Sequence, residues 1–236
     1  MNENGETMDE TTFREKLAAI DIPLSTSQYE QFALYCTMLL SWNETMNLTA
    51  ITERDMVFEK HFYDAAHFVK AVNPNHSSIL DIGSGAGFPG IVLKILFPSI
   101  QLTIIDATKK RIKFLQALCE ALSIDVTLRH ERAEMHALKN HYDIVTARAV
   151  AELNILVELC VPFVKVGGVF VAFKGDRVDE EMAKAKQAVR LTGARIDQNV
   201  FYKIHDRTRS LLRFEKVQPT ASKYPRAFSK IKKSPL

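Results

Sequence analysis

The sequence LDIGSGAGFPG, Leu80–Gly90, carries glycines at positions 83, 85, 87 and 90 and continues the short apolar run that begins at Ser77. A strand that ends in such a turn is typical of the first unit of a doubly wound α/β sheet, where the turn holds a nucleotide-like ligand. Glycine-rich cradles of this kind bind either a pyrophosphate or S-adenosylmethionine. The stretch therefore predicts the fold class and leaves two ligands to compare.

The carboxylate of Asp81 distinguishes between these ligands. It lies on the expected strand, two residues before the first glycine, where its negative charge would oppose a pyrophosphate. S-adenosylmethionine carries an ammonium and a sulfonium and no phosphate, so the same charge favours it. Gly85, Gly87 and Gly90 do match the dinucleotide fingerprint Gly-x-Gly-x-x-Gly, but that match alone is weak. The loop thus favours S-adenosylmethionine, with an NAD-dependent oxidoreductase as the alternative.

Two further strand ends are expected to contact the cofactor. Asp106 closes the second strand, where a carboxylate can accept hydrogen bonds from both hydroxyls of a ribose in either cofactor. The end of the third strand brings Ala133 and Glu134 to the adenine edge, where Glu134 or nearby backbone would meet the amino group. A solvated loop is the alternative for Ala133 and Glu134.

Around this loop the chain alternates short apolar strands with amphipathic helices. Such alternation predicts a parallel sheet with helices on both faces. Two final strands joined only by HDRT predict a closing antiparallel hairpin. The expected fold class is α/β, a Rossmann-like doubly wound sheet of the class I methyltransferase type that ends in this hairpin. Strands are expected at 78–83, 101–106, 124–130, 142–149, 167–175, 194–204 and 209–217, and helices at 91–97, 108–122, 152–164 and 179–192.

The chain divides into three parts by pattern. The first part is helical, with a capping box of Ser25 and Gln28 at one helix start. The turn-forming VNPNHSS marks its end, and the last part has three prolines, no acids and no periodicity, so it is expected to be irregular. The expected parts are an N-terminal helical region at 1–75, a methyltransferase core at 76–217 and a basic C-terminal tail at 218–236.

Composition is that of an ordinary globular protein, with 47% hydrophobic and 25% charged residues in a chain of 236. No apolar stretch approaches the roughly 18 residues that span a membrane, and the first ten residues, MNENGETMDE, lack the apolar run of a leader. We therefore expect a cytoplasmic protein away from membranes, with a monomer favoured. Cys36, Cys119 and Cys160 lack the close pairing of a metal knuckle, so we expect buried thiols and no metal.

Positive charge is concentrated at the C-terminal end. From Tyr202 to Leu236 there are ten lysines and arginines against two acids, Asp206 and Glu215, although the net charge of the whole chain is only +3. Such a local excess indicates a polyanionic partner.

The ends of the fourth and fifth strands bear on the methyl acceptor. Methylation of an exocyclic amine commonly uses an Asn/Asp-Pro-Pro-aromatic loop after the fourth strand, and methylation of a pyrimidine carbon needs a cysteine. The segment DIVTARAV, residues 143–150, contains neither. A ring nitrogen with a free lone pair, such as guanine N7, is compatible with this because it needs alignment and no base. Arg148 and Lys174 are candidates to hold RNA phosphate or the guanine O6 and N7 edge, with surface charges as the alternative.

Together these motifs resemble the RsmG family, once called glucose-inhibited division protein B. The resemblance is carried by LDIGSGAGFPG, IDATKKRIKFL, ERAE, DIVTARAVAEL, GGVFVAFKG and KYPR…KKSPL, and it extends upstream to WNETMNLTAIT and HFYDA. It implies a class I methyltransferase that transfers a methyl group from S-adenosylmethionine to N7 of a guanine in 16S ribosomal RNA. The implied partner is small-subunit ribosomal RNA or the 30S particle, and a non-catalytic RNA-binding module on this scaffold is a further alternative.

The resemblance also assigns residues. The positions that match the family's S-adenosylmethionine contacts are Gly83, Phe88, Ala133, Glu134 and Arg148, and Asp106 matches its ribose position. Asp81 and Gly85 complete the expected cofactor site from the loop. For His61 and Asp64, three residues apart, a pair on the helix surface is expected. In the tail, AFSKIK at 227–232 departs from the family's usual turn of small residues.

Overall fold

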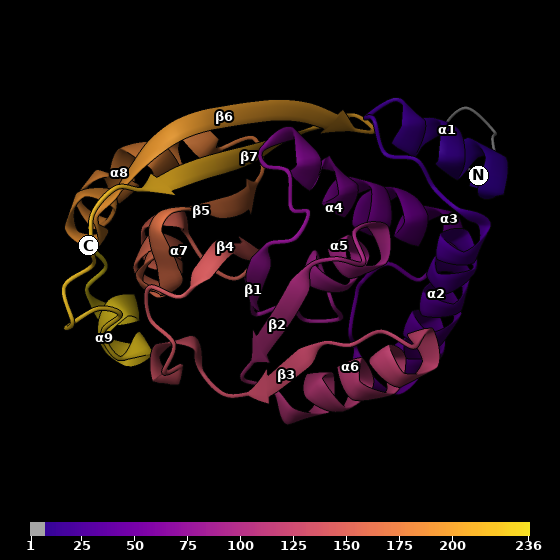
Figure 1. The fold of residues 1–236 in the computed structure, drawn as a ribbon, viewed down its shortest axis with the longest axis horizontal. Coiled ribbons are helices and arrows are strands. Elements are labelled where there is room, and N and C mark those ends of the chain that lie inside the picture. The colour runs from indigo at the N-terminus through magenta and orange to yellow at the C-terminus, as the bar shows by residue number, and fades with distance from the viewer. Residues whose placement is uncertain (1–7) are drawn as a thin grey trace.

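The computed structural model describes residues 8–236. A seven-stranded sheet lies at its centre in the order β3-β2-β1-β4-β5-β7-β6 (Figure 1). Residues 1–7, which form most of the acidic stretch in which no leader was expected, lie outside the described residues.

The strands confirm the predicted sheet. The pairs formed by β1 to β5 are all parallel, and β7 runs antiparallel between β5 and β6. The third strand begins later than predicted, at Thr127, because Ile124 N still donates to the Cys119 carbonyl at the end of the preceding helix and the pairing with β2 starts only at Thr127. The bounds are β1 Ser78–Ile82, β2 Gln101–Asp106, β3 Thr127–His130, β4 Tyr142–Arg148, β5 Val164–Lys174, β6 Ala194–Ile204 and β7 Arg207–Lys216.

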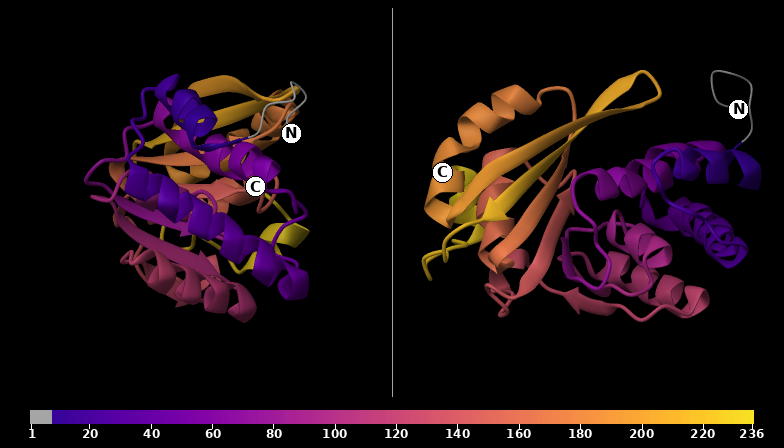
Figure 2. Two further views of the ribbon diagram at one scale, coloured as in Figure 1. Left: turned by 90° about the vertical axis from the view of Figure 1, so that its right-hand side faces the viewer. Right: turned by 45° about the horizontal axis from the view of Figure 1, so that its top comes forward.

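Helices cover both faces of the sheet (Figure 2). Successive residues of one strand point to opposite faces, so Ile79 joins the core beneath the N-terminal helices while Leu80 joins the core beneath α7 and α8. The helices of the core are α5 Gly90–Leu96, α6 Lys109–Leu122, α7 Leu153–Cys160 and α8 Val178–Thr192, with short 3-10 turns η3 Ala133–Met135 and η4 Val161–Phe163.

The N-terminal region is helical, as expected, but its second half changes type from turn to turn. A π-helical turn, η1, interrupts the α-helical hydrogen bonding directly before Asp64. Such turns are often found at functional sites. The elements are α1 Glu10–Ala18, α2 Thr26–Met46, α3 Arg54–Val57, η1 Phe58–Tyr63, α4 Asp64–Ala66 and the 3-10 turn η2 His67–Lys70.

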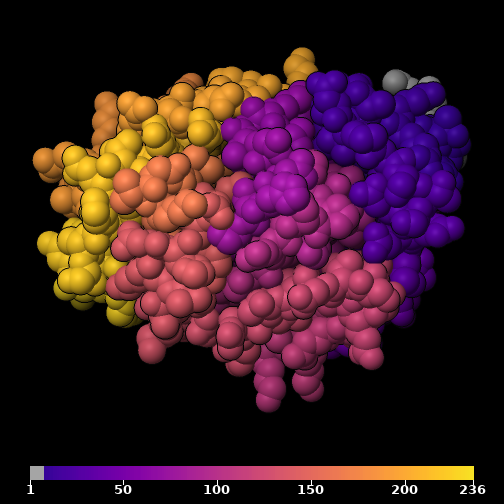
Figure 3. Space-filling model, viewed as in Figure 1, coloured from indigo at the N-terminus to yellow at the C-terminus, as the bar shows by residue number. Residues whose placement is uncertain are grey.

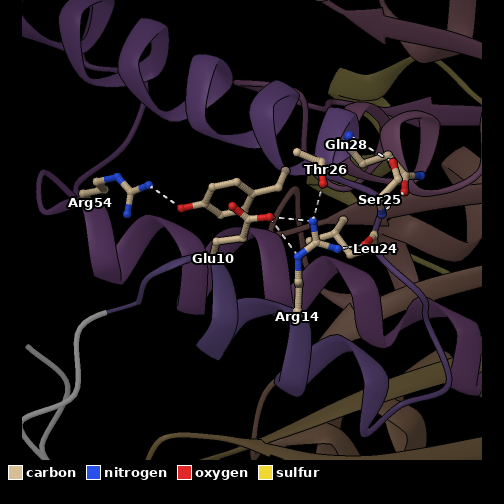
Figure 4. Close-up of polar contacts among 8 residues, drawn as sticks. Glu10, Arg14, Leu24, Ser25, Thr26, Gln28 and Arg54 are labelled. Atoms are coloured by element: carbon tan, nitrogen blue, oxygen red, sulfur yellow. Dashed lines mark hydrogen bonds and ion pairs between the residues drawn. The ribbon is translucent and has the colours of Figure 1, made fainter.

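Side-chain hydrogen bonds join the first helices (Figure 4). The predicted capping box is confirmed, since Gln28 N donates to Ser25 Oγ at 3.2 Å and Ser25 N donates to Gln28 Oε1 at 2.9 Å. Arg14 donates to Glu10 on its own helix and to the Leu24 carbonyl and the Thr26 hydroxyl at the start of α2. These bonds fix α1 against α2, and Gln28 Nε2 ties α2 to the core by donating to the Ile95 carbonyl at 2.8 Å.

The C-terminal tail is ordered, which corrects the expectation of an irregular segment. It forms a helix, α9 Phe228–Lys233, whose Ile231 is completely buried in the core beneath α7. Arg226 donates to Glu158 of α7 at 2.5 and 2.6 Å. Hydrophobic periodicity does not reveal this helix, because it is short, is flanked by prolines, and has only two apolar residues, Phe228 and Ile231.

All three cysteines are buried free thiols, as expected. Burial raises the pKa of Cys36 and of Cys119 to about 11. Within residues 8–236, no helix combines the length and the apolar character that crossing a membrane would require.

Candidate functional site

Three adjoining cavities lie at the carboxyl ends of the parallel strands, where doubly wound sheets bind their ligands. The apolar cavity, about 170 Å³, is bordered by Gly83, Ile105, Ala133, Val150, Leu159 and Phe228. The loop cavity, about 190 Å³, is bordered by Thr49, Gly83, Gly85, Phe88, Arg111 and Arg148. The basic cavity, about 550 Å³, is bordered by Lys60, Arg148, Lys174, Tyr202, Arg207 and Arg209.

Shared residues connect the three cavities into a row. Gly83 borders both the apolar and the loop cavity. His61, Arg148 and Ala149 border both the loop and the basic cavity. A larger cavity of about 980 Å³ lies at the opposite edge, against the first residues of β1 and β2, and none of the predicted site residues borders it.

Two glycines of the loop are required by close approach and by backbone conformation. Gly83 has φ +71°, and a Cβ added there would lie 2.8 Å from Val150 Cγ2. Gly87 has φ +105°, and a Cβ there would lie 2.6 Å from the Tyr35 hydroxyl. Only glycine adopts such angles without strain. The loop is thus packed tightly on both sides, and at Gly83 and Gly85 it presents backbone to the loop cavity.

Asp81 lies beneath the loop and borders none of the three cavities. Its Oδ2 accepts hydrogen bonds from Ser84 Oγ at 2.6 Å and from Gly90 N at 2.8 Å, and the residue is completely buried. Its Oδ1 is also buried and has no hydrogen-bond partner among the described residues. Burial raises the pKa of Asp81 to about 7. Asp81 therefore holds the conformation of the loop through these hydrogen bonds. It does not contact the cavities, so we expect it to attract a cationic ligand only through its charge, acting from the other side of the loop.

Asp106 stands at the end of β2, as predicted, and joins the glycine loop to α6. Its Oδ2 accepts from Gly85 N at 3.2 Å and from Arg111 Nη1 at 3.3 Å, and its Oδ1 accepts from Thr108 N at 2.7 Å. A ribose hydroxyl at this position would share the carboxylate with these donors.

Ala133 and Glu134 form the 3-10 turn that borders the apolar cavity. The structure thereby brings them to the same cavity as Gly83, as their expected roles in one cofactor site require. Glu134 Oε1 accepts a hydrogen bond from Phe228 N at 3.2 Å. Sequence reasoning missed Phe228, because it lies in the tail that was expected to be irregular.

Arg148 contacts both the N-terminal region and the glycine loop. Its Nη1 lies 3.0 Å from Asp64 Oδ2, and its Nη2 donates to His61 Nδ1 at 3.2 Å. The guanidinium also lies over the ring of Phe88, 4.7 Å from the centroid. His61 and Asp64 therefore do not form the expected surface pair, and Asp64 is only 5% exposed. The spacing of His61 and Asp64 in the sequence predicts that they share one face of a helix. It does not reveal that this face packs against the end of β4.

The hydrogen bonds of His61 define its tautomer. A guanidinium only donates, so Nδ1 must accept and Nε2 carries the proton. Nε2 then donates to Thr49 Oγ1 at 2.8 Å. Burial, together with the charge of Arg148, lowers the pKa of His61 to about 3, so the ring is neutral near pH 7. Its ring stacks on Phe88 with centroids 4.4 Å apart, which ties the N-terminal region to the glycine loop.

Tyr202 of β6 completes the network from the hairpin. Its hydroxyl donates to Asp64 Oδ1 at 2.9 Å, so both oxygens of that carboxylate are engaged. Burial raises the pKa of Tyr202 far above its ordinary value. No sequence motif marks Tyr202, because its partner is distant in the chain and is reached only through the sheet.

Lys174 reaches the ligand edge as predicted, but its ammonium is occupied. Nζ lies 2.6 Å from Glu181 Oε2 and 2.9 Å from the Ala151 carbonyl, and the side chain is 8% exposed. The geometry of Lys174 is better suited to holding the segment after β4 in place than to binding RNA phosphate.

Arg209, which was not predicted from the sequence, borders the basic cavity. Its Nε is buried and has no hydrogen-bond partner among the described residues.

Comparison with known proteins gives consistent matches over most of the chain. The family model described as rRNA small subunit methyltransferase G, GidB, matches residues 28–211. The protein named ribosomal RNA small subunit methyltransferase G of Bacillus cytotoxicus is 46% identical over 91% of this chain and 93% of its own. The protein of the same name from Streptococcus pneumoniae strain R6 is 43% identical over 97% of this chain and 100% of its own.

Solved structures with low sequence identity share the fold. TYW2 of M. jannaschii, solved in complex with AdoMet, aligns with a TM-score of 0.57 at 14% identity, covering 71% of this chain and 80% of its own. A SAM-dependent methyltransferase from Aquifex aeolicus aligns with a TM-score of 0.53 at 15% identity, covering 67% of this chain and 92% of its own.

Proposed function

Since the chain belongs to the rRNA small subunit methyltransferase G family and is an S-adenosylmethionine-dependent methyltransferase of 16S ribosomal RNA, we propose that a guanine enters the basic cavity and is methylated at N7 beside Arg148. The fold class, the cofactor and the activity predicted from the sequence are thereby confirmed. The oxidoreductase and non-catalytic alternatives are set aside, because relatives that match nearly the whole chain are named as methyltransferases.

The observation that carries the proposal is the place of Arg148 between two cavities of different character. On one side the loop and apolar cavities present backbone glycines, Ala133 and Glu134, which suit the two ends of S-adenosylmethionine. On the other side the basic cavity is large enough for a base and is rich in cations. A cofactor and an acceptor that meet at Arg148 would each approach from its own cavity.

The chemistry fits an acceptor that needs no base. When bound, S-adenosylmethionine supplies an electrophilic methyl group, and its transfer to a ring nitrogen leaves the sulfur with the bonding pair and releases no proton. Two carboxylates border the basic cavity: both oxygens of Asp64 are engaged by Arg148 and Tyr202, and Asp206 lies exposed in the turn between β6 and β7. Of the residues that the structure describes, those that border this cavity include no cysteine. The residues there can position a base and counter the charge of RNA, which is what methylation of N7 requires.

Arginine and lysine side chains at the rim suit the recognition of RNA. Lys60 comes from η1, and Arg207 and Arg209 come from β7. Such side chains bind phosphate oxygens and the O6 and N7 edge of guanine. We assign Arg209 to the acceptor because its Nε is buried beside the cavity without a hydrogen-bond partner among the described residues.

A transfer assay with base mapping tests this function. The protein is incubated with labelled S-adenosylmethionine and either unmethylated small subunits or protein-free 16S RNA, and the labelled nucleotide is identified by mass spectrometry. We expect N7-methylguanosine at one RNA position, no label with Gly83→Val, and reduced labelling with Arg209→Gln. Label on protein, on another atom, or on no RNA would overturn the proposal.

A further inference from the structure

Phe228 borders the apolar cavity from the C-terminal tail. The other walls come from the core, with Gly83 from the glycine loop, Ile105 from β2 and Leu159 from α7. The backbone of Phe228 is tied to this site, since its N donates to Glu134 Oε1 at 3.2 Å. The tail thus meets the cavity on the side of Glu134, where the adenine edge is expected.

Anchors on both sides hold Phe228 at this position. Before it, Arg226 forms two side-chain bonds to Glu158, a carboxylate with no solvent exposure. After it, Ile231 is completely buried in the core. Lys139 also donates to the carbonyls of Ser222 and Tyr224. Figure 3 shows the tail in yellow packed on the body of the molecule, so Phe228 belongs to a docked segment with a fixed place.

The chemistry of this wall suits a flat heteroaromatic ring. The Phe228 side chain is partly buried against the core, and the Arg132 guanidinium lies over its ring, 5.9 Å from the centroid. Aromatic side chains bind nucleobases through their faces and edges, whatever the sequence of the nucleic acid. A carboxylate has two oxygens, so Glu134 can accept from an exocyclic amino group as well as from Phe228 N.

We infer that Phe228 contacts the adenine of the cofactor, and that the C-terminal tail is thereby an element of the cofactor site. The inference rests on the proposed function only in taking S-adenosylmethionine as the ligand. It gives the tail a role besides its charge, because Arg226 anchors the segment to Glu158 and, among the cations of the tail, only the four lysines remain exposed.

Calorimetric titration with S-adenosylhomocysteine and with 5′-methylthioadenosine, which lacks the amino-acid part, tests the inference on the full chain. We expect Phe228→Ala to raise the Kd of both ligands by the same factor, about tenfold. Phe228→Leu keeps an apolar side chain without the ring and is expected to retain the Tm of the ligand-free protein with a smaller loss of affinity. Lys232→Ala, an exposed position on the same helix, is the matched control and should change neither Kd.

The outcomes separate the inference from the function on which it rests. If the unaltered protein binds neither ligand, the proposed cofactor is wrong. If the unaltered protein binds both ligands and Phe228→Ala and Phe228→Leu bind them equally well, the inference is wrong. It is equally overturned if the loss affects S-adenosylhomocysteine and spares 5′-methylthioadenosine, or if the variants lose affinity for 16S RNA while both Kd values stay unchanged.

Discussion

The guanidinium of Arg148 is held by the carboxylate of Asp64, with Nη1 and Oδ2 3.0 Å apart. Arg148 is the last residue of β4, and Asp64 begins α4 in the N-terminal region. The orientation of the side chain between the loop and basic cavities is therefore set from outside the sheet. The N-terminal region therefore contributes to the site in which we propose that cofactor and acceptor meet.

Replacing Asp64 should affect both stability and catalysis. Asp64→Ala leaves Arg148, whose side chain is 13% exposed, without its counter-ion, and removing one partner of a buried pair costs about 3–5 kcal/mol. We expect a lower Tm and a fall of at least about tenfold in kcat/KM for methyl transfer, because misalignment is costly in such reactions. Thermal unfolding and transfer kinetics measure the two effects. Asp206→Asn, a change at an exposed carboxylate that borders the same cavity, is the control, and an equal loss there would contradict the argument.

His61 predicts a dependence of stability on pH. Its pKa is lowered to about 3 by burial and by the charge of Arg148, whereas an unfolded histidine titrates near about 6.5. The unfolded chain therefore binds the proton first, and the stability contributed by neutral His61 is lost as the pH falls from about 6.5 towards 3. We expect a fall in Tm between pH 6.5 and 5 that is smaller in His61→Gln. Identical slopes in the two proteins would contradict the assignment of a buried, neutral ring.

The sequence was sufficient for the sheet and for placing most candidate site residues at the carboxyl ends of the strands, because both depend on local patterns. Strands follow from apolar runs, and the loop follows from glycines whose positive φ no other residue accepts easily. The partners of those residues were not predictable in the same way. Tyr202 meets Asp64, and Phe228 meets Glu134, only after the chain has folded. For Lys174, the sequence predicted its position at the end of the strand but not its ion pair with Glu181.

Gly83 should be sensitive for two separable reasons. Its φ of +71° strains any side chain, at about 1–2 kcal/mol, and a Cβ would lie 2.8 Å from Val150 Cγ2. We expect Gly83→Ala to weaken binding of S-adenosylhomocysteine at least about tenfold, and adding Val150→Ala to restore only part of it. Gly175→Ala is the matched control, because a Cβ there meets nothing within 4 Å. Full restoration by Val150→Ala would show that the backbone conformation is immaterial.

Asp81 should link cofactor affinity to pH. Burial raises the pKa of Asp81 to about 7, so the folded protein holds the proton more tightly than the unfolded chain does. The resulting stabilisation of the fold is complete below about pH 4 and is lost as the pH rises through about 7. A cation bound beyond the loop favours the ionised carboxylate and lowers this pKa. Affinity for S-adenosylmethionine should therefore increase between pH 6 and 8, and Asp81→Asn should bind more weakly with a flatter profile. Titration calorimetry at several pH values measures this, and an unchanged slope in Asp81→Asn would remove the electrostatic argument.

Glu158 offers a test of the docked tail from a residue that borders none of the three cavities. Its carboxylate is completely buried and accepts from Arg226 Nε and Nη2 at 2.6 and 2.5 Å. Breaking this buried pair in Glu158→Gln should cost about 3–5 kcal/mol, free the tail for proteolysis, and weaken binding of S-adenosylhomocysteine through the loss of Phe228 from the apolar cavity. Glu215→Gln removes the exposed pair with Arg195 and is expected to change the free energy of unfolding by less than about 1 kcal/mol. A Glu158→Gln protein whose tail is cleaved but whose affinity is intact would show that the tail docks on the core without serving the cofactor.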